Sequence, residues 1–201
     1  MLFRSKTREP EVFAGRKPSL CPGCGHRMVF NVLKELQVTV SGDIGCYTLG
    51  VLPPFSSIHT CVCMGAGITM FEGLRRAQNN NVVGVIGDST FVHSGITGLI
   101  NAAYNKMTGV IIVLDNSITA MTGGQPHPGV GLTLKGEKTK TLSLEKIVQA
   151  SGADHVDVMD PALMNDFKKL LKKRMRQKKL SVIIARRPCK LLMDKQKKTK
   201  L

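Results

Sequence analysis

Short runs of apolar residues alternate along the chain with stretches in which apolar residues recur every three or four positions. A run that is apolar on both faces is typical of a strand buried inside a parallel sheet, whereas the second pattern predicts an amphipathic helix. The sequence therefore predicts strands over 38–40, 81–86, 110–114, 155–158 and 180–185, and helices over 25–36, 66–77, 94–104, 143–151 and 161–176.

This alternation predicts one α/β domain around a mostly parallel sheet, with helices on both faces. We expect the domain over 18–192, between a basic lead-in (1–17) and a basic tail (193–201). Ligands of such sheets bind beyond the carboxyl ends of the strands, which places the chemistry in the loops after Val40, Ile86, Leu114 and Ala185. A long Gly-rich loop over 116–140 is also expected to be functional or mobile.

Composition excludes several classes of protein. Hydrophobic residues make up 42% of the 201 residues and aromatic residues 4%, which predicts an aliphatic core and excludes disordered, collagen-like and disulfide-dense chains. The longest apolar runs have strand length, so no segment is expected to span a membrane. No signal peptide is recognisable, and we expect a cytoplasmic setting in which the six cysteines are ligands or free thiols.

The net charge of +15 is concentrated near the C-terminus. Fifteen of the 29 basic residues lie from Lys168 to Leu201, where Asp194 is the one acid, so the first 167 residues carry 14 basic and 13 acidic residues. The basic segment lacks interleaved aromatic or glycine residues, which makes nucleic acid an unlikely partner. A solvated helix face is favoured, and a patch that attracts an acidic electron carrier stays open.

Polar residues with metal-binding chemistry follow two neighbouring buried strands. Gly87-Asp88-Ser89 follows one strand and Asp115-Asn116 the next, so Asp88 and Asn116 emerge at the same edge of the sheet. Mg²⁺ prefers carboxylate and amide oxygens together with phosphate oxygens, and glycine lets the backbone approach a phosphate closely. Either motif alone is typical of a turn, but the pair indicates a magnesium–diphosphate site.

The same residues resemble the thiamine diphosphate motif, a Gly-Asp-Gly that ends in Asn after 25 to 30 residues. Ser89 stands here for the second Gly, and Asp115 for the first Asn. Asp115-Asn116 and the stretch 121–125 resemble the 2-oxoacid:ferredoxin oxidoreductases. Over 18–192 the chain most resembles the alpha subunits of the indolepyruvate ferredoxin oxidoreductases, through segments 41–50, 87–95 and 119–128.

The resemblance implies a thiamine diphosphate-binding fold of the pyrophosphate type. It implies that Asp88, Asn116 and the carbonyl of Ile118 hold Mg²⁺. The other residues implied to bind the cofactor are Gly45, Cys46, Gly87, Ser89, His93, Met121 and Thr122.

Four cysteines are candidate ligands of a second metal centre. Cys21-Pro-Gly-Cys24 is suited to clamp one metal, and Cys46 and Cys189 follow the first and last strands, at the same edge of the sheet. Four thiolates satisfy a [4Fe–4S] cluster or a zinc ion. The spacing leaves both open, together with unliganded thiols, whereas the resemblance implies a [4Fe–4S] cluster on these four residues.

Other candidates have a structural interpretation at least as good as a functional one. Cys61 and Cys63 are interpreted as small buried residues at a loop-to-helix join, with a thiol near the substrate as the less favoured alternative. His26 is interpreted as a capping or packing group at the start of a helix, and His59 as a surface or cofactor-facing residue. His127, in the long loop, is a candidate for substrate contact on loop closure.

The resemblance implies an oxidoreductase that decarboxylates a 2-oxoacid, with an arylpyruvate such as indolepyruvate favoured, and forms an acyl-CoA. Electrons would pass through the cluster to ferredoxin. The activating glutamate is expected from a separate pyrimidine-binding-domain subunit, and a gamma-type subunit is a further expected partner, so no catalytic residue is assigned here. Two alternatives stay open: a thiamine-dependent non-oxidative decarboxylase subunit, and a zinc-stabilised module that binds nucleic acid.

Overall fold

The computed structural model describes residues 18–78 and 81–199, and the predicted lead-in (1–17) lies outside them. Its centre is a five-stranded sheet in the order β1-β2-β3-β5-β4, in which every neighbouring pair is parallel. This confirms the predicted parallel sheet. The strands are β1 (Thr39–Ser41), β2 (Val82–Gly87), β3 (Gly109–Asp115), β4 (His155–Met159) and β5 (Leu180–Arg186).

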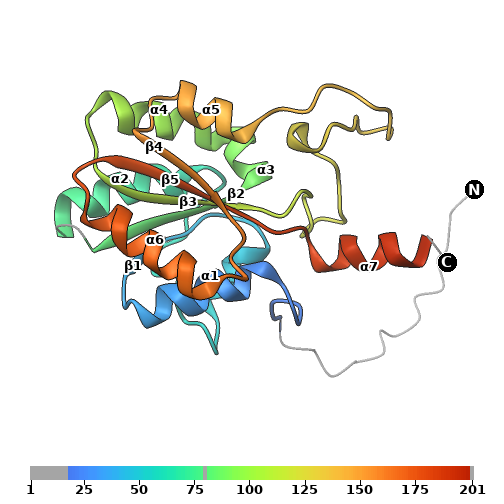
Figure 1. Ribbon diagram of the computed structural model, residues 1–201, viewed down its shortest axis with the longest axis horizontal. Coiled ribbons are helices and arrows are strands. Elements are labelled where there is room, and N and C mark those ends of the chain that lie inside the picture. The colour runs from blue at the N-terminus through green and yellow to red at the C-terminus, as the bar shows by residue number, and fades with distance from the viewer. Residues whose placement is uncertain (1–17, 79–80, 200–201) are drawn as a thin grey trace, which may run out of the picture.

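Helices cover both faces of the sheet, as the alternation predicts (Figure 1). The two faces form separate hydrophobic clusters, one with α1 and α6 and the other with α2, α4 and α5. These helices are α1 (Gly25–Glu35), α2 (Ala66–Gln78), α4 (Ile96–Tyr104), α5 (Leu144–Ala150) and α6 (Met164–Arg176).

The central strand β3 shows why the strands are apolar throughout. Val110 and Ile112 belong to the cluster under α1 and α6, whereas Ile111 and Val113 belong to the opposite cluster. Successive side chains of a strand point to opposite faces, so a strand covered on both sides has no solvent-facing position for a polar residue.

Two helices begin at residues that differ from those predicted by the spacing of apolar residues. The helix predicted over 94–104 starts six residues earlier, because α3 (Asp88–Thr90) and a π-helical turn (Phe91–Gly95) lead directly into α4. The helix predicted over 161–176 begins at Met164. Pro161 instead lies in a turn in which the Ala162 N–H donates to Asp160 Oδ1 at 2.8 Å, a bond typical of Asx turns.

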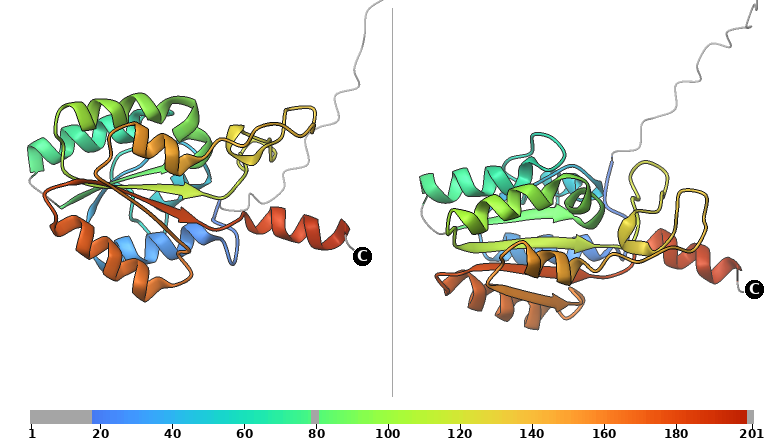
Figure 2. Two further views of the ribbon diagram at one scale, coloured as in Figure 1. Left: turned by 45° about the horizontal axis from the view of Figure 1, so that its top comes forward. Right: turned by 90° about the horizontal axis from the view of Figure 1, so that it is seen from above.

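The C-terminal segment forms α7 (Lys190–Thr199), which crosses the predicted boundary between 192 and 193. Figures 1 and 2 show that α7 and the long loop before α5 both lie beyond the same edge of the sheet. None of the helices in the described part of the chain is long and apolar enough to cross a membrane.

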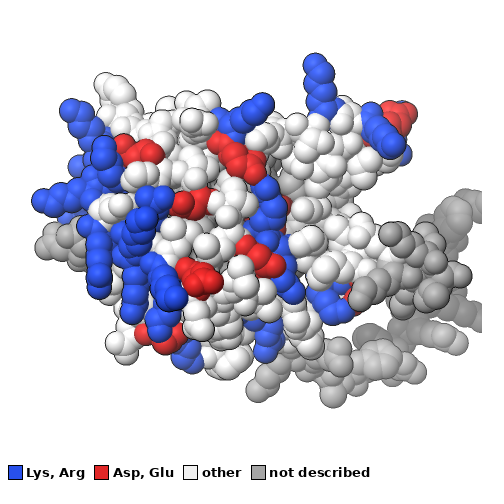
Figure 3. Space-filling model, viewed as in Figure 1, with Lys and Arg blue, Asp and Glu red and all other residues white. Residues whose placement is uncertain are grey.

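Much of the basic segment forms the outer face of α6. Lys169, Lys172, Lys173 and Arg176 are exposed, whereas Phe167 and Leu171 of the same helix are buried. Figure 3 shows basic side chains gathered over this part of the surface. The prediction of a solvated helix face is therefore confirmed for α6.

Candidate functional site

A cavity of about 90 Å³ lies beyond the carboxyl ends of β1, β2 and β3. His93 does not line it, because the π-helical turn leaves this side chain exposed. All other predicted cofactor residues do line it: Gly45, Cys46, Gly87, Asp88, Ser89, Asn116, Ile118, Met121 and Thr122.

Asp88 ties the ends of β2 and β3 together. Its Oδ2 accepts hydrogen bonds from the backbone N–H groups of Asn116, at 3.0 Å, and Ser117, at 2.8 Å. Its Oδ1 accepts from the Ser89 N–H at 2.8 Å. Ser117 has a φ of 61°, in the left-handed region, where strained residues often mark functional sites. The structure thus brings Asp88 and Asn116 together, as two strands ending at one edge require.

Asn116 links this carboxylate to a buried histidine. Asn116 Oδ1 accepts from the Ile118 N–H at 3.1 Å, and its Nδ2 lies 3.4 Å from His26 Nε2. Burial lowers the pKa of His26 to about 4, although the charge of Asp88 acts in the opposite direction. The imidazole is therefore neutral at neutral pH. Its ring packs edge-on against Tyr47, with centroids 6.0 Å apart, which agrees with a packing role.

The loop after β1 is organised by Asp43, a residue that the sequence reasoning did not single out. Its side chain is fully buried. Oδ1 accepts from the N–H groups of Ile44, at 2.7 Å, and Gly65, at 2.9 Å, while Oδ2 accepts from the Gly67 N–H at 2.7 Å. The carboxylate therefore fixes the turn before Cys46 against the start of α2. The Ser-Gly-Asp sequence directly after a predicted strand was the available signal.

Two glycines let the backbone pass close to Tyr47. A Cβ at Gly45 would lie 2.4 Å from Tyr47 Cε1, and one at Gly87 would lie 2.6 Å from the same atom. The phenol donates to the Ile44 carbonyl at 2.9 Å, and burial raises the pKa of Tyr47. Any side chain at either glycine would displace this ring.

His127 brings the long loop down onto the same carboxylate. The imidazole is buried, with Nε2 3.2 Å from Asp88 Oδ2, and its Nδ1 accepts from the Gly129 N–H at 3.2 Å. The sequence suggests a substrate contact, but the contact with Asp88 spans 39 residues and no spacing rule would have indicated it.

The four predicted ligand cysteines line a second cavity, of about 70 Å³: Cys21, Cys24, Cys46 and Cys189. Burial raises the pKa of Cys46 to about 11, and the other three thiols act in the same direction. Four thiolates here would repel one another unless a cation offset their charge, so the donor set suits a metal or cluster. Among residues 18–78 and 81–199, no three or more His, Cys, Asp or Glu side chains form, in their present positions, a group that could hold a metal ion.

The two cavities share part of their walls. His26, Cys46, Asn116 and Ala120 line both. In addition, the Cys189 N–H donates to the Asn116 carbonyl at 2.9 Å. One residue therefore contacts Asp88 through its N–H and fixes a cysteine of the second cavity through its carbonyl.

Cys61 and Cys63 are exposed, so the prediction that they are small buried residues is wrong. They do lie just before a helix, α2, but on the surface of the loop that leads into it. His59 is also exposed and does not line either cavity; its Nδ1 accepts from the Val40 N–H at 3.0 Å. This agrees with the surface interpretation.

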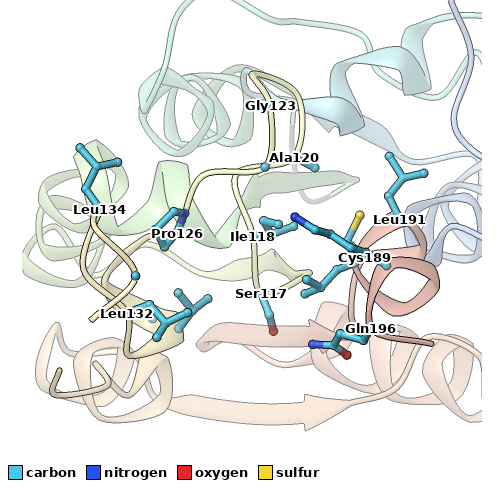
Figure 4. A pocket seen from close by; sticks show the side chains of 16 residues that line it. Ser117, Ile118, Ala120, Gly123, Pro126, Leu132, Leu134, Cys189, Leu191 and Gln196 are labelled. Atoms are coloured by element: carbon cyan, nitrogen blue, oxygen red, sulfur yellow. The ribbon is translucent and has the colours of Figure 1, made fainter. Parts of the chain in front are cut away.

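A larger hollow, of about 800 Å³, separates the long loop from α7 (Figure 4). Its labelled walls are mainly apolar and include Ile118 and Leu134 from the loop and Leu191 from α7. Cys189 lines this hollow as well as the cysteine cavity. The hollow and the cysteine cavity therefore share a wall at Cys189.

The fold and this site define a thiamine diphosphate-binding domain. Residues 43–185 match the family described as thiamine pyrophosphate enzyme, C-terminal TPP binding domain, and the chain belongs to that family. The match includes most of the loop after β1 and the ends of β2 and β3, where the first cavity lies.

Individual relatives narrow this class. The chain is 42% identical over 185 residues to the indolepyruvate oxidoreductase subunit IorA of Methanothermobacter thermautotrophicus, covering 88% of this chain. It is 39% identical over 188 residues to the IorA subunit of Archaeoglobus fulgidus, covering 91% of this chain. The resemblance to these alpha subunits is thus confirmed. The chain spans 30% of the length of each of the two subunits.

A solved structure supports the fold independently. The 2-oxoglutarate:ferredoxin oxidoreductase from Magnetococcus marinus matches with a TM-score of 0.72 over 86% of this chain and 65% of that chain. At 20% sequence identity this likeness concerns the fold alone. Together with the family match, it confirms the predicted thiamine diphosphate-binding fold.

Proposed function

We propose that the chain is the diphosphate-binding part of a 2-oxoacid:ferredoxin oxidoreductase, with an arylpyruvate such as indolepyruvate as its substrate. The identity to IorA subunits over about nine-tenths of the chain supports this proposal. When bound, thiamine diphosphate supplies nucleophilic chemistry at the keto carbon of a 2-oxoacid, and a [4Fe–4S] cluster supplies one-electron transfer. The products would be CO₂, an acyl-CoA and reduced ferredoxin.

The observation that carries the proposal is the meeting of Asp88 and Asn116 at one cavity. A carboxylate, an amide oxygen and the carbonyl of Ile118 are the hard oxygen ligands that Mg²⁺ takes together with phosphate oxygens. The residues present therefore fit a magnesium-bound diphosphate. Gly45 and Gly87 would let the backbone approach it closely.

The second cavity supports a cluster on Cys21, Cys24, Cys46 and Cys189. Its donor set is the one that a [4Fe–4S] cluster takes. Because this cavity shares walls with the first, a redox centre in it would adjoin the diphosphate site. Electron transfer requires a redox centre close to the diphosphate site, whereas a structural zinc ion could lie anywhere in the fold. We therefore favour the cluster.

The other residues of the site would position the cofactor and shield it. The neutral imidazole of His26 would separate the two cavities without adding charge. Met121, which is half-exposed at the rim of the first cavity, and Thr122 would contact the cofactor. His93 is exposed and does not line the first cavity, so we propose for it only a place on the surface around this site.

The proposed enzyme would need partners, since the chain spans 30% of the IorA subunits that it matches. A pyrimidine-binding domain would supply the activating glutamate and complete the substrate pocket. A gamma-type subunit and ferredoxin would complete the assembly, in a cytoplasmic setting that keeps the cysteines from forming disulfides.

The test is a calorimetric titration of thiamine diphosphate with Mg²⁺ into the chain and its Asp88→Asn variant. We expect the variant to bind at least tenfold more weakly, because it loses the charge that holds the metal. Asp166→Asn, at an exposed position of α6, is the matched control and should bind as the unmodified chain does. Equal binding by Asp88→Asn would contradict the metal assignment, and equal binding of thiamine without its diphosphate would contradict the diphosphate site.

Iron, sulfide and zinc analysis of anaerobically purified chain tests the second cavity. About four irons and four sulfides per chain are expected, and Cys46→Ser and Cys189→Ser should each lower that content while Cys63→Ser leaves it unchanged. Thiamine diphosphate binding without iron would favour the non-oxidative decarboxylase. Zinc, with salt-dependent nucleic-acid binding and no thiamine diphosphate binding, would favour the nucleic-acid module.

A further inference from the structure

Arg187 forms one wall of the cysteine cavity, and the proposed function does not use it. It lies between β5 and Cys189 and lines the cavity with the four cysteines. Its aliphatic part packs against the start of α1, where a Cβ at Gly25 would lie 3.1 Å from Arg187 Cβ. The side chain is therefore held at the cavity by its packing against the backbone at Gly25.

The guanidinium of Arg187 is only partly satisfied by protein groups. Its Nη1 donates to Asp160 Oδ2 at 2.8 Å. Its Nε is buried and has no hydrogen-bond acceptor, although 30% of the side chain is exposed. A buried donor without an acceptor is rare in folded proteins and calls for an explanation.

We infer that Arg187 is a charge-compensating residue of the four-cysteine site and raises the reduction potential of the cluster held there. This inference rests on the proposed function, because it assumes a cluster on those cysteines. An arginine is positively charged at any pH at which proteins fold. A reduced cluster carries one more negative charge than the oxidised cluster, so a fixed neighbouring cation favours the reduced form.

The experiment compares the midpoint potentials of the reconstituted chain and three variants by redox titration monitored with electron paramagnetic resonance. Arg187→Gln removes the charge, and we expect the reduction equilibrium to shift at least tenfold toward the oxidised form, which is about 59 mV for one electron. Arg187→Lys keeps the charge and should shift less. Arg174→Gln, which removes an arginine paired with Asp157 away from the cavity, should leave the potential unchanged.

A fourth variant covers the case in which Arg187→Gln fails to hold a cluster. Asp160→Asn leaves the arginine in place but removes its negative partner, so the potential should rise. A fall or no change with Asp160→Asn would overturn the inference, as would a full cluster with unchanged potential in Arg187→Gln or equal shifts in Arg187→Gln and Arg187→Lys.

The failure of this inference can be told apart from that of the proposed function. Iron and sulfide content is measured on every sample before the titration. An unmodified chain that binds no cluster refutes the proposed cluster itself. An unmodified chain with a cluster whose potential does not depend on the charge at Arg187 refutes only the role of that residue.

Discussion

Replacing Asp43 with asparagine should destabilise the whole domain, because this side chain joins two segments through three backbone hydrogen bonds. The carboxylate is fully buried and accepts from Ile44, Gly65 and Gly67. Asparagine has the same shape, but its amide group can accept through one oxygen only. In the variant, the NH₂ group would therefore face the Gly67 N–H, donor against donor.

The size of the effect follows from these contacts. A buried N–H left without an acceptor costs about 1–3 kcal/mol, and each of the two remaining bonds loses roughly 1 kcal/mol because its acceptor is no longer charged. The expected loss is about 3–5 kcal/mol, a large part of the ~5–15 kcal/mol of a typical domain. At roughly 2–4 °C per kcal/mol for a chain of this size, the melting temperature should fall by about 6–20 °C.

Urea unfolding followed by circular dichroism measures this loss, and the midpoint should fall by roughly 1–2 M. Asp166→Asn is the control, since its exposed ion pair with Lys169 contributes no more than about 1 kcal/mol. A midpoint for Asp43→Asn equal to that of the control would refute the reasoning. It would mean that the loop before Cys46 is held by something other than this carboxylate.

Three further results are expected. Gly87→Ala should fold less stably and lose thiamine diphosphate binding in calorimetry, because its Cβ would lie 2.6 Å from Tyr47 Cε1; unchanged binding would contradict this close packing. The hydrogen bond from Arg186 lowers the pKa of Glu145 to about 2 from 4.5. The stabilisation from this half-exposed pair, no more than about 1 kcal/mol, should be complete above pH 4.5 and lost as the pH falls toward 2. Glu145→Gln should therefore weaken the pH dependence of the unfolding free energy between pH 4.5 and about 2. An unaltered pH dependence would argue against a stabilising Glu145–Arg186 pair. His127→Ala should speed tryptic cleavage of the long loop several-fold, measured by mass spectrometry; unchanged cleavage would show that its buried contacts do not hold the loop down.

Much of the fold could be predicted because burial on both faces of a parallel sheet leaves a plain pattern. The runs around Ile86 and Leu114 admit few interpretations, and once both strands are parallel their ends must share an edge. Asp88 and Asn116 could therefore be paired without structural information. The sequence signal was strong because the parallel arrangement of the two strands brings Asp88 and Asn116 together, whatever turns follow the strands.

Other features depend on contacts that no local pattern records. The π-helical turn at 91–95 adds a residue to one helical turn, so the periodicity conceals the true start of the helix and leaves His93 exposed. Cys61 and Cys63 are small, weakly polar residues, but they lie in a surface loop whose path no local pattern records. The contact between His127 and Asp88 depends on the path of a long irregular loop.

The hydrogen bond from the Cys189 N–H to the Asn116 carbonyl has a consequence for the speed of the proposed reaction. Electron tunnelling slows steeply as donor and acceptor separate. In this chain the spacing between the two centres would be set when the sheet folds, with no hinge or swinging arm between them. Electron transfer between the two centres would then need no conformational change. The docking of the external carrier would therefore decide when electrons leave the chain.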